Sequence, residues 1–199
     1  MHISEGILSG PVLISGSLLT AAGTGIGLYR LDYDRITHVA VMTAGFFVAS
    51  LVHVPIGPAS VHLILNGLMG IFLGWGAFPG ILVALFLQAV LFQYGGLTTL
   101  GINCLNMGLP ALICFYLFRK AVANKDPRVF MTASFLCGSL AVFLGALMVA
   151  LSLAFTGRAF HGAARILVVA HFPVMMIEGL ITMFCIKFLR NVRPELLES

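Results

Sequence analysis

The sequence predicts an all-α polytopic membrane protein with seven transmembrane helices in a single domain covering residues 1–199. Three observations support this fold class. Only 9% of the residues are charged, whereas about 25% are charged in soluble globular chains. The mean hydropathy is +1.07. Finally, charged, Gly-rich and Pro-rich breaks divide the chain into apolar segments long enough for a bilayer core of about 30 Å.

Seven apolar segments follow one another along the chain. Their approximate ranges are 8–29, 38–54, 60–76, 78–94, 103–119, 129–155 and 163–189. The third and fourth are short and almost contiguous, so their boundary within 74–80 is the least defined. No soluble domain or long linker is expected. The four cysteines stand singly in apolar runs, which is typical of small buried side chains rather than of disulfides.

The basic residues predict the orientation of the chain. If the chain crosses the membrane seven times, nine Lys and Arg fall on the C-terminal side and only Arg158 and Arg165 on the other. Because cytoplasmic loops are enriched in Lys and Arg, the C-terminus is expected inside and the N-terminus outside. The location is then a bacterial or archaeal cytoplasmic membrane. The net charge of +4 reports topology and does not indicate a nucleic-acid partner.

The stretch "HVPIGPASVHLILNGL" (53–68) holds two of the few ionisable residues within the apolar segments. Pro55 and Pro58 forbid a continuous helix. The stretch is therefore interpreted as a helix end, a tight turn and a new helix, with Ser60 as its N-cap and His62 in its first turn. His62 would then lie on the outward side, either as a metal ligand or as a helix-start histidine at the headgroups. His53 is equally compatible with a supporting partner and an interfacial histidine.

Other polar residues at membrane depth have less defined roles. His171 and Glu178 are seven residues apart in the last segment, hence on one helical face, and interhelical or backbone hydrogen bonding is favoured over a metal role. The loop "QYGGLTTLGIN" (93–103) is compatible with either a plain turn or a lid over a pocket. Its last residue, Asn103, is a candidate to support a site.

In the N-terminal "MHISEG", a histidine at position 2 alone is weak evidence, because chain termini are usually disordered. Joined to an outward-facing start and an outward His62, it is compatible with either a disordered start or a metal site. The α-amine of Met1, the amide nitrogen of His2 and the His2 imidazole can chelate one ion in fused five- and six-membered rings. A fourth nitrogen would complete a square-planar site, which favours Ni(II) or Cu(II) over Zn(II). His62, on the same side, is the best-placed fourth donor. Glu5 is expected to satisfy a helix dipole or to help position the first residues.

Four motifs in order resemble the CbiM/NikM family, the substrate-binding S components of energy-coupling factor (ECF) transporters for cobalt and nickel. They are "MHISEG", "HVPIGPASVHLILNGLMG" (53–70), "GGLTTLGINCLNMG" (95–108) and "FPVMMIEGLITMFCIKFLRNVRPELL" (172–197). The resemblance implies a seven-helix S component whose metal ligands are Met1, His2 and His62. It also implies a transmembrane coupling subunit, two cytoplasmic ATPase subunits and a small auxiliary membrane subunit. The chain itself has no GxxxxGK[ST] phosphate loop.

Ala40 and Ala44 form an AxxxA pattern on the second segment, which suits either close packing with a coupling subunit or ordinary internal packing. Two rival functions remain. A secondary divalent-cation transporter or channel would act without ATPase partners. An intramembrane enzyme is disfavoured because neither HExxH nor GxSxG is present. Nickel is slightly preferred over cobalt, and the use of the metal downstream stays open.

Overall fold

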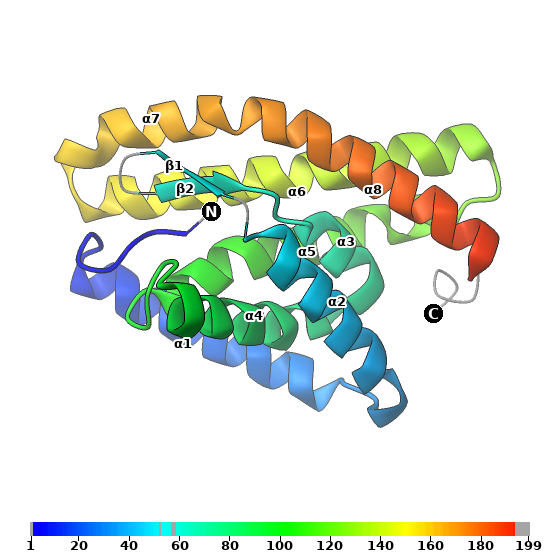
Figure 1. Cartoon of the computed structure of the whole chain (residues 1–199), viewed down its shortest axis with the longest axis horizontal. Coiled ribbons are helices and arrows are strands. Elements are labelled where there is room, and N and C mark those ends of the chain that lie inside the picture. Colours follow the sequence, from blue (N-terminus) through cyan, green and yellow to red (C-terminus); the bar gives the residue numbers. More distant parts are fainter. Residues whose placement is uncertain (1, 52, 57–58, 194–199) are drawn as a thin grey trace.

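The computed structural model describes residues 2–51, 53–56 and 59–193, with only the backbone described for 53–56 and 59–61. Nearly all of the described chain is helical (Figure 1). The helices are α1 (Gly10–Tyr29), α2 (Ile36–Ala49), α3 (Asn66–Leu73), α4 (Ala77–Phe92), α5 (Leu100–Val122), α6 (Pro127–Thr156), α7 (His161–Ala170) and α8 (Phe172–Val192). Three 3₁₀ turns, η1 (Tyr33–Arg35), η2 (Gly74–Gly76) and η3 (Arg158–Phe160), connect some of them.

Five stretches in the described chain are long and apolar enough to cross a membrane. They are Gly10–Tyr29, Asn66–Phe92, Leu100–Val122, Pro127–Thr156 and Arg158–Val192. A multi-pass membrane protein is therefore confirmed at this coarser level. The seven-span count and the orientation stay predictions, because α2 has only 14 residues and α3 only eight.

The prediction of a helix starting at Ser60 is wrong. Residues His53–Ile56 (β1) and Ala59–His62 (β2) form a two-stranded antiparallel hairpin, in which the backbone of His53 is opposite that of His62. Two prolines within four residues remove backbone donors, and a short hairpin tolerates this better than a helix does. Ser60 therefore lies in a strand rather than at a helix N-cap, and α3 begins only at Asn66. His62 ends the second strand.

A further break occurs within the predicted boundary at 74–80. Gly74 has a φ of +52°, a left-handed conformation that glycine adopts without steric cost. Helix α3 ends there, and η2 turns the chain into α4. The last predicted segment is also interrupted, because α7 ends at Ala170 and α8 begins at Phe172. His171 and Glu178 thus do not share one continuous helix.

Helix α6 lies at the centre of the bundle and packs against α5 and α8. Small residues allow these helices to approach closely: a Cβ added to Gly67 on α3 would lie 2.9 Å from the Cα of Gly138 on α6. The two ends of the bundle differ. The N-terminal segment, the hairpin and α7 gather at one end, whereas the C-terminal ends of α1 and α8 and the start of α6 lie at the other (Figure 1). The second end is called the basic end below, after Arg30, Arg35, Arg119 and Arg190.

Candidate metal centre

The chain enters the bundle at its N-terminus, where His2 is 4% exposed and Ile3 is fully buried. The side-chain amide of Asn103, on α5, holds this segment. Its Oδ1 accepts a hydrogen bond from the Ile3 N–H at 2.9 Å, and its Nδ2 donates to the Ile3 carbonyl at 3.1 Å. Asn103 thus pairs with the backbone as a neighbouring strand would. This two-point contact fixes the position of His2 immediately before it.

The His2 ring is oriented by Gln88 on α4. The Nε2–H of His2 donates a hydrogen bond to Gln88 Oε1 at 2.8 Å. The Gln88 amide group, itself fully buried, donates to the Phe47 carbonyl and to Ser50 Oγ. Because Gln88 Oε1 can only accept, the neutral His2 ring carries its proton on Nε2 and its basic lone pair on Nδ1. Nδ1 is the nitrogen that closes a six-membered chelate ring with the His2 amide nitrogen.

His62 lies beside His2, although 60 residues separate them in the sequence. The two ring centroids are 4.7 Å apart with an angle of 31° between the ring planes. His62 Nδ1–H donates to the Leu63 carbonyl at 2.6 Å, which places the basic lone pair on Nε2. Ligand nitrogens lie about 2.0–2.1 Å from a divalent transition-metal ion, so two imidazoles at this separation fit one ion between them.

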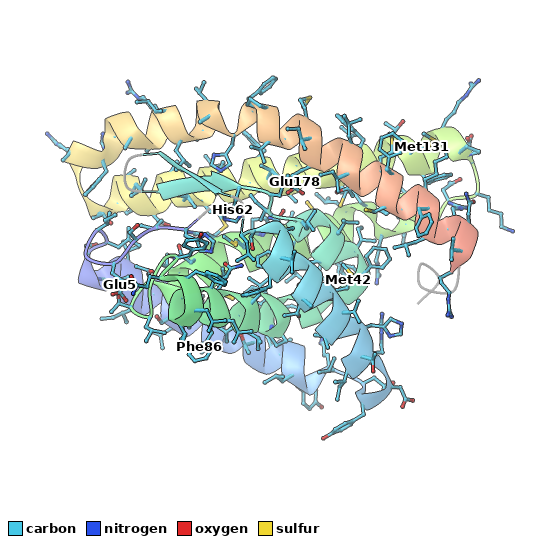
Figure 2. All side chains as sticks on the ribbon, viewed as in Figure 1. Glu5, Met42, His62, Phe86, Met131 and Glu178 are labelled. Carbon is cyan, nitrogen blue, oxygen red and sulfur yellow. The ribbon has the colours of Figure 1, made fainter. Side chains whose placement is uncertain are left out.

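Glu178 supports the turn that follows His62 (Figure 2). This fully buried carboxylate on α8 accepts hydrogen bonds from the backbone N–H groups of Ile64 and Leu65. Leu65 has a φ of +51°, a conformation that costs a leucine about 1–2 kcal/mol. The bond to the backbone is the role that the sequence favoured for Glu178. The carboxylate ties α8 to the segment that positions His62.

His171 is also fully buried, at the junction of α7 and α8. Its Nδ1–H donates to the Leu167 carbonyl at 2.7 Å, one helical turn earlier. This bond caps the end of α7. The backbone hydrogen bonding that the sequence favoured is therefore present for both His171 and Glu178.

The segment 93–99 packs against the first described residues of the chain, His2 and Glu5. Gly95 has a φ of +76°, and a Cβ there would lie 3.0 Å from Asn103 Nδ2 and 3.5 Å from His2 Cδ2. Any side chain at this position would thus press on the two residues of the site. The Tyr94 ring centroid is 6.4 Å from that of His2. The loop therefore packs on His2 and Asn103, and its function as a lid stays a prediction.

Glu5 joins the N-terminal segment to the same loop. Its Oε1 accepts from the Thr98 N–H at 3.0 Å and lies 3.3 Å from Thr98 Oγ1. The backbone N–H of Thr98 holds the pKa of Glu5 below its ordinary value. Thr98 lies just before α5, so the helix start that Glu5 serves is that of α5 rather than of α1.

The remaining predicted site residues are placed as follows. Met1 and the side chains of His53 and Ser60 lie outside the described residues. Ala40 and Ala44 lie on the exposed face of α2, away from the two histidines. Within the part of the chain that the structure describes, no three His, Cys, Asp or Glu side chains cluster as metal ligands. A site at His2 and His62 would therefore need backbone nitrogens as well.

Sequence reasoning missed Gln88 and Ser50 as site residues. Gln88 is an amide within an apolar segment, and such a residue usually makes a structural or functional hydrogen bond. Its position four residues before the end of α4 places it at the depth of the N-terminus. The position of Gln88 along the apolar segment was the signal available in the sequence. Its hydrogen-bond partner, His2, is known only from the three-dimensional structure.

Comparisons with known proteins show the family of the chain. The family model described as "Cobalt uptake substrate-specific transmembrane region" (CbiM) matches residues 2–196. The chain belongs to the CbiM family. This is a metal-transport family rather than a family of catalytic enzymes.

Relatives of this CbiM-family chain carry related descriptions. A metal transport protein of Haemophilus influenzae is 39% identical over 99% of this chain and 97% of its own length. The cobalt transport protein CbiM of Sorangium cellulosum is 30% identical over 100% of this chain and 95% of its own length. The fused nickel transport protein NikMN of Rhodobacter capsulatus is 29% identical over 99% of this chain but only 64% of its own length.

The fold recurs in a crystal structure of a transition metal transporter. That structure aligns with a TM-score of 0.83 and 23% identity, covering 96% of this chain and 93% of the other. At this identity the likeness establishes the fold alone. It supports the overall helical arrangement.

Proposed function

We propose that this CbiM-family chain binds Ni²⁺ or Co²⁺ and serves as the substrate-specificity subunit of an ECF-type transporter. The single observation that carries the proposal is the pairing of two buried imidazoles, His2 and His62, 4.7 Å apart. Their hydrogen bonds leave the basic lone pairs on Nδ1 and Nε2, respectively. The metal is the transported substrate and not a resident cofactor.

The proposed ligands are four nitrogen atoms: the Met1 amine, the His2 amide nitrogen, His2 Nδ1 and His62 Nε2. The first three form fused chelate rings that hold the ion close to one plane, and His62 supplies the fourth corner. Square-planar nitrogen ligation favours Ni(II), and low-spin Co(II) accepts the same geometry. The donor set therefore predicts a slight preference for nickel. Asn103, Gln88, Glu5 and Glu178 position the ligands from four different elements.

Transport would depend on other subunits. The chain has no phosphate-binding loop, so ATP hydrolysis would belong to two cytoplasmic ATPase subunits. A transmembrane coupling subunit and a small auxiliary membrane subunit would complete the assembly. Ala40 and Ala44 on the exposed face of α2 offer small side chains for close helix contact with the coupling subunit. In this proposal the chain crosses the cytoplasmic membrane seven times, with the N-terminus outside.

Radioactive nickel and cobalt uptake tests this proposal. Proteoliposomes with the chain alone are compared with proteoliposomes containing the chain, coupling subunit and ATPases, with and without internal ATP. We expect metal binding by the chain alone but ATP-dependent accumulation only in the complete assembly. Accumulation by the isolated chain would instead favour the alternative, a secondary divalent-cation transporter or channel.

A further inference from the structure

A cavity lies at the basic end, opposite the histidines. Its volume is about 210 Å³, and it is enclosed by the end of α1, the start of α2, the turn around η2 and the end of α5. Three arginines line it, namely Arg30, Arg35 and Arg119. The one acidic residue lining it is Asp32, so the charged groups around the cavity sum to +2.

Aromatic rings hold the guanidinium groups of Arg30 and Arg119 in place. The Arg30 Cζ lies 5.4 Å from the Trp75 ring centroid, and the Arg119 Cζ lies 5.0 Å from that of Phe115. Cation–π contacts of this kind orient the planar group but leave its N–H donors directed outward. Among the described residues, neither Arg30 nor Arg119 forms an ion pair. Both guanidinium groups therefore retain donors for an anion.

Hydrogen bonds fix the groups that surround these two guanidinium groups. Asp32 Oδ1 accepts the Asp34 N–H at 3.2 Å and thereby caps η1. Arg35 Nη2 donates to the Phe72 carbonyl at 3.2 Å, which anchors the third guanidinium at the rim of the cavity. The Trp75 indole N–H donates to the Tyr116 hydroxyl at 2.9 Å and fixes the aromatic wall. The walls of the cavity are thus preorganised, and Arg30 and Arg119 carry the donors that an anion would meet.

The position of the cavity indicates the ligand. Helix α1 has 20 residues and is about 30 Å long, so Arg30 at its end lies at the membrane interface whichever way the chain is oriented. Trp75 and Tyr116 have the amphipathic character typical of this interface. Phosphate groups of lipids are present at this depth, and arginine binds phosphate oxygens in a bidentate manner. Apolar Val39, Ile71 and Leu73 line the same cavity.

We propose that this cavity binds the phosphate headgroup of an anionic phospholipid, such as phosphatidylglycerol, between Arg30 and Arg119. The apolar side of the cavity would contact the glycerol and the first methylene groups. Basic pockets between membrane helices recognise anionic headgroups through the same combination of cations and apolar walls. This site is independent of the proposed metal centre.

Trp75 is the single tryptophan of the chain and lines the cavity, so its fluorescence reports on occupancy. The detergent-purified chain is titrated with short-chain phosphatidylglycerol, phosphatidylcholine of the same chain length, and inorganic phosphate. We expect a saturable change with phosphatidylglycerol only. An equal response to phosphatidylcholine would overturn the proposal, and so would an equal response to inorganic phosphate, which would identify a site for a soluble anion.

The double variant R30Q/R119Q tests the assignment, with Arg128→Gln as the control at the same end but outside the cavity. The variant also alters the surroundings of Trp75 and hence its fluorescence. Native mass spectrometry therefore measures bound phosphatidylglycerol independently. We expect at least ten-fold weaker lipid binding in the double variant, unchanged binding in the control, and normal metal binding in both as proof of folding. Unchanged lipid binding by a folded R30Q/R119Q protein would overturn the proposal.

Discussion

The two ends of the molecule handle polar groups in opposite ways. Around His2 and His62, the polar side chains Gln88, Asn103 and Ser50 are buried, uncharged and joined by hydrogen bonds. At the basic end, guanidinium groups are exposed and lie on aromatic rings. A divalent cation must lose its water to enter the first environment and is repelled by the second. The arginines around the cavity at the basic end, Arg30, Arg35 and Arg119, therefore lie away from the place where the cargo would bind.

The largest expected effect tests whether metal binding at the histidine end requires His62. In His62→Ala the proposed fourth nitrogen is removed, and water is a poorer ligand for square-planar Ni(II). We expect Ni²⁺ affinity to fall by at least about 100-fold, measured by isothermal titration calorimetry. His161→Ala is the matched control because it removes an exposed histidine at the same end of the bundle. Equal losses in both variants would show that the effect is not specific to the site.

The variant Gln88→Leu tests the orientation of the His2 ring without removing a proposed metal ligand. The substitution removes the acceptor of the His2 Nε2–H, so the ring can exchange tautomer and turn away from the chelating geometry. Loss of such an outer-shell partner typically costs 10–100-fold in metal affinity. Titration should show this fall, together with a changed Ni(II) visible absorption spectrum. Gln93→Asn, at an exposed helix end with a φ of +58°, should bind normally.

Asn103→Leu tests how the N-terminal segment is held. The variant leaves the Ile3 N–H and carbonyl buried without these bonds, at a cost of about 1–3 kcal/mol for each group. We expect roughly ten-fold weaker Ni²⁺ binding and faster amide hydrogen exchange at residues 3–5. Asn191→Leu, exposed near the end of α8, serves as the control. Unchanged exchange in Asn103→Leu would mean that packing alone holds the segment.

Glu5 offers the smallest effect, because its side chain is exposed to solvent. The Thr98 N–H lowers its folded-state pKa, so its stabilising contribution is present above the unfolded pKa of about 4.3 and is lost as the pH falls through the folded value. The thermal stability of the native chain should therefore exceed that of Glu5→Gln at pH 6–7. The difference should vanish near pH 3. A difference that persists at pH 3 would contradict this role of the carboxylate.

The sequence predicts the helical membrane fold well, because apolar segments, charge asymmetry and helix breakers are all local signals. It fails for the hairpin, since the prolines indicated a break but not that Ser60 and His62 would lie in a strand. The count of apolar segments and of Lys and Arg residues alone predicts that His2 and His62 lie on the same side of the membrane. Neither the role of Gln88 nor the backbone partner of Glu178 could be predicted. The partners lie 86 and 113 residues away in the sequence and depend on how the helices pack.

The central claim is that the chain start itself supplies metal ligands. Isothermal titration of the purified protein with Ni²⁺, Co²⁺ and Zn²⁺ tests it most directly, using a chain that begins at Met1 and one extended by a single residue before it. The extension converts the amine of Met1 into an amide and moves the new amine out of the chelate ring. The account predicts tight binding of Ni²⁺ and Co²⁺ by the first chain only, with Zn²⁺ weaker. Undiminished Ni²⁺ binding by the extended chain would contradict it.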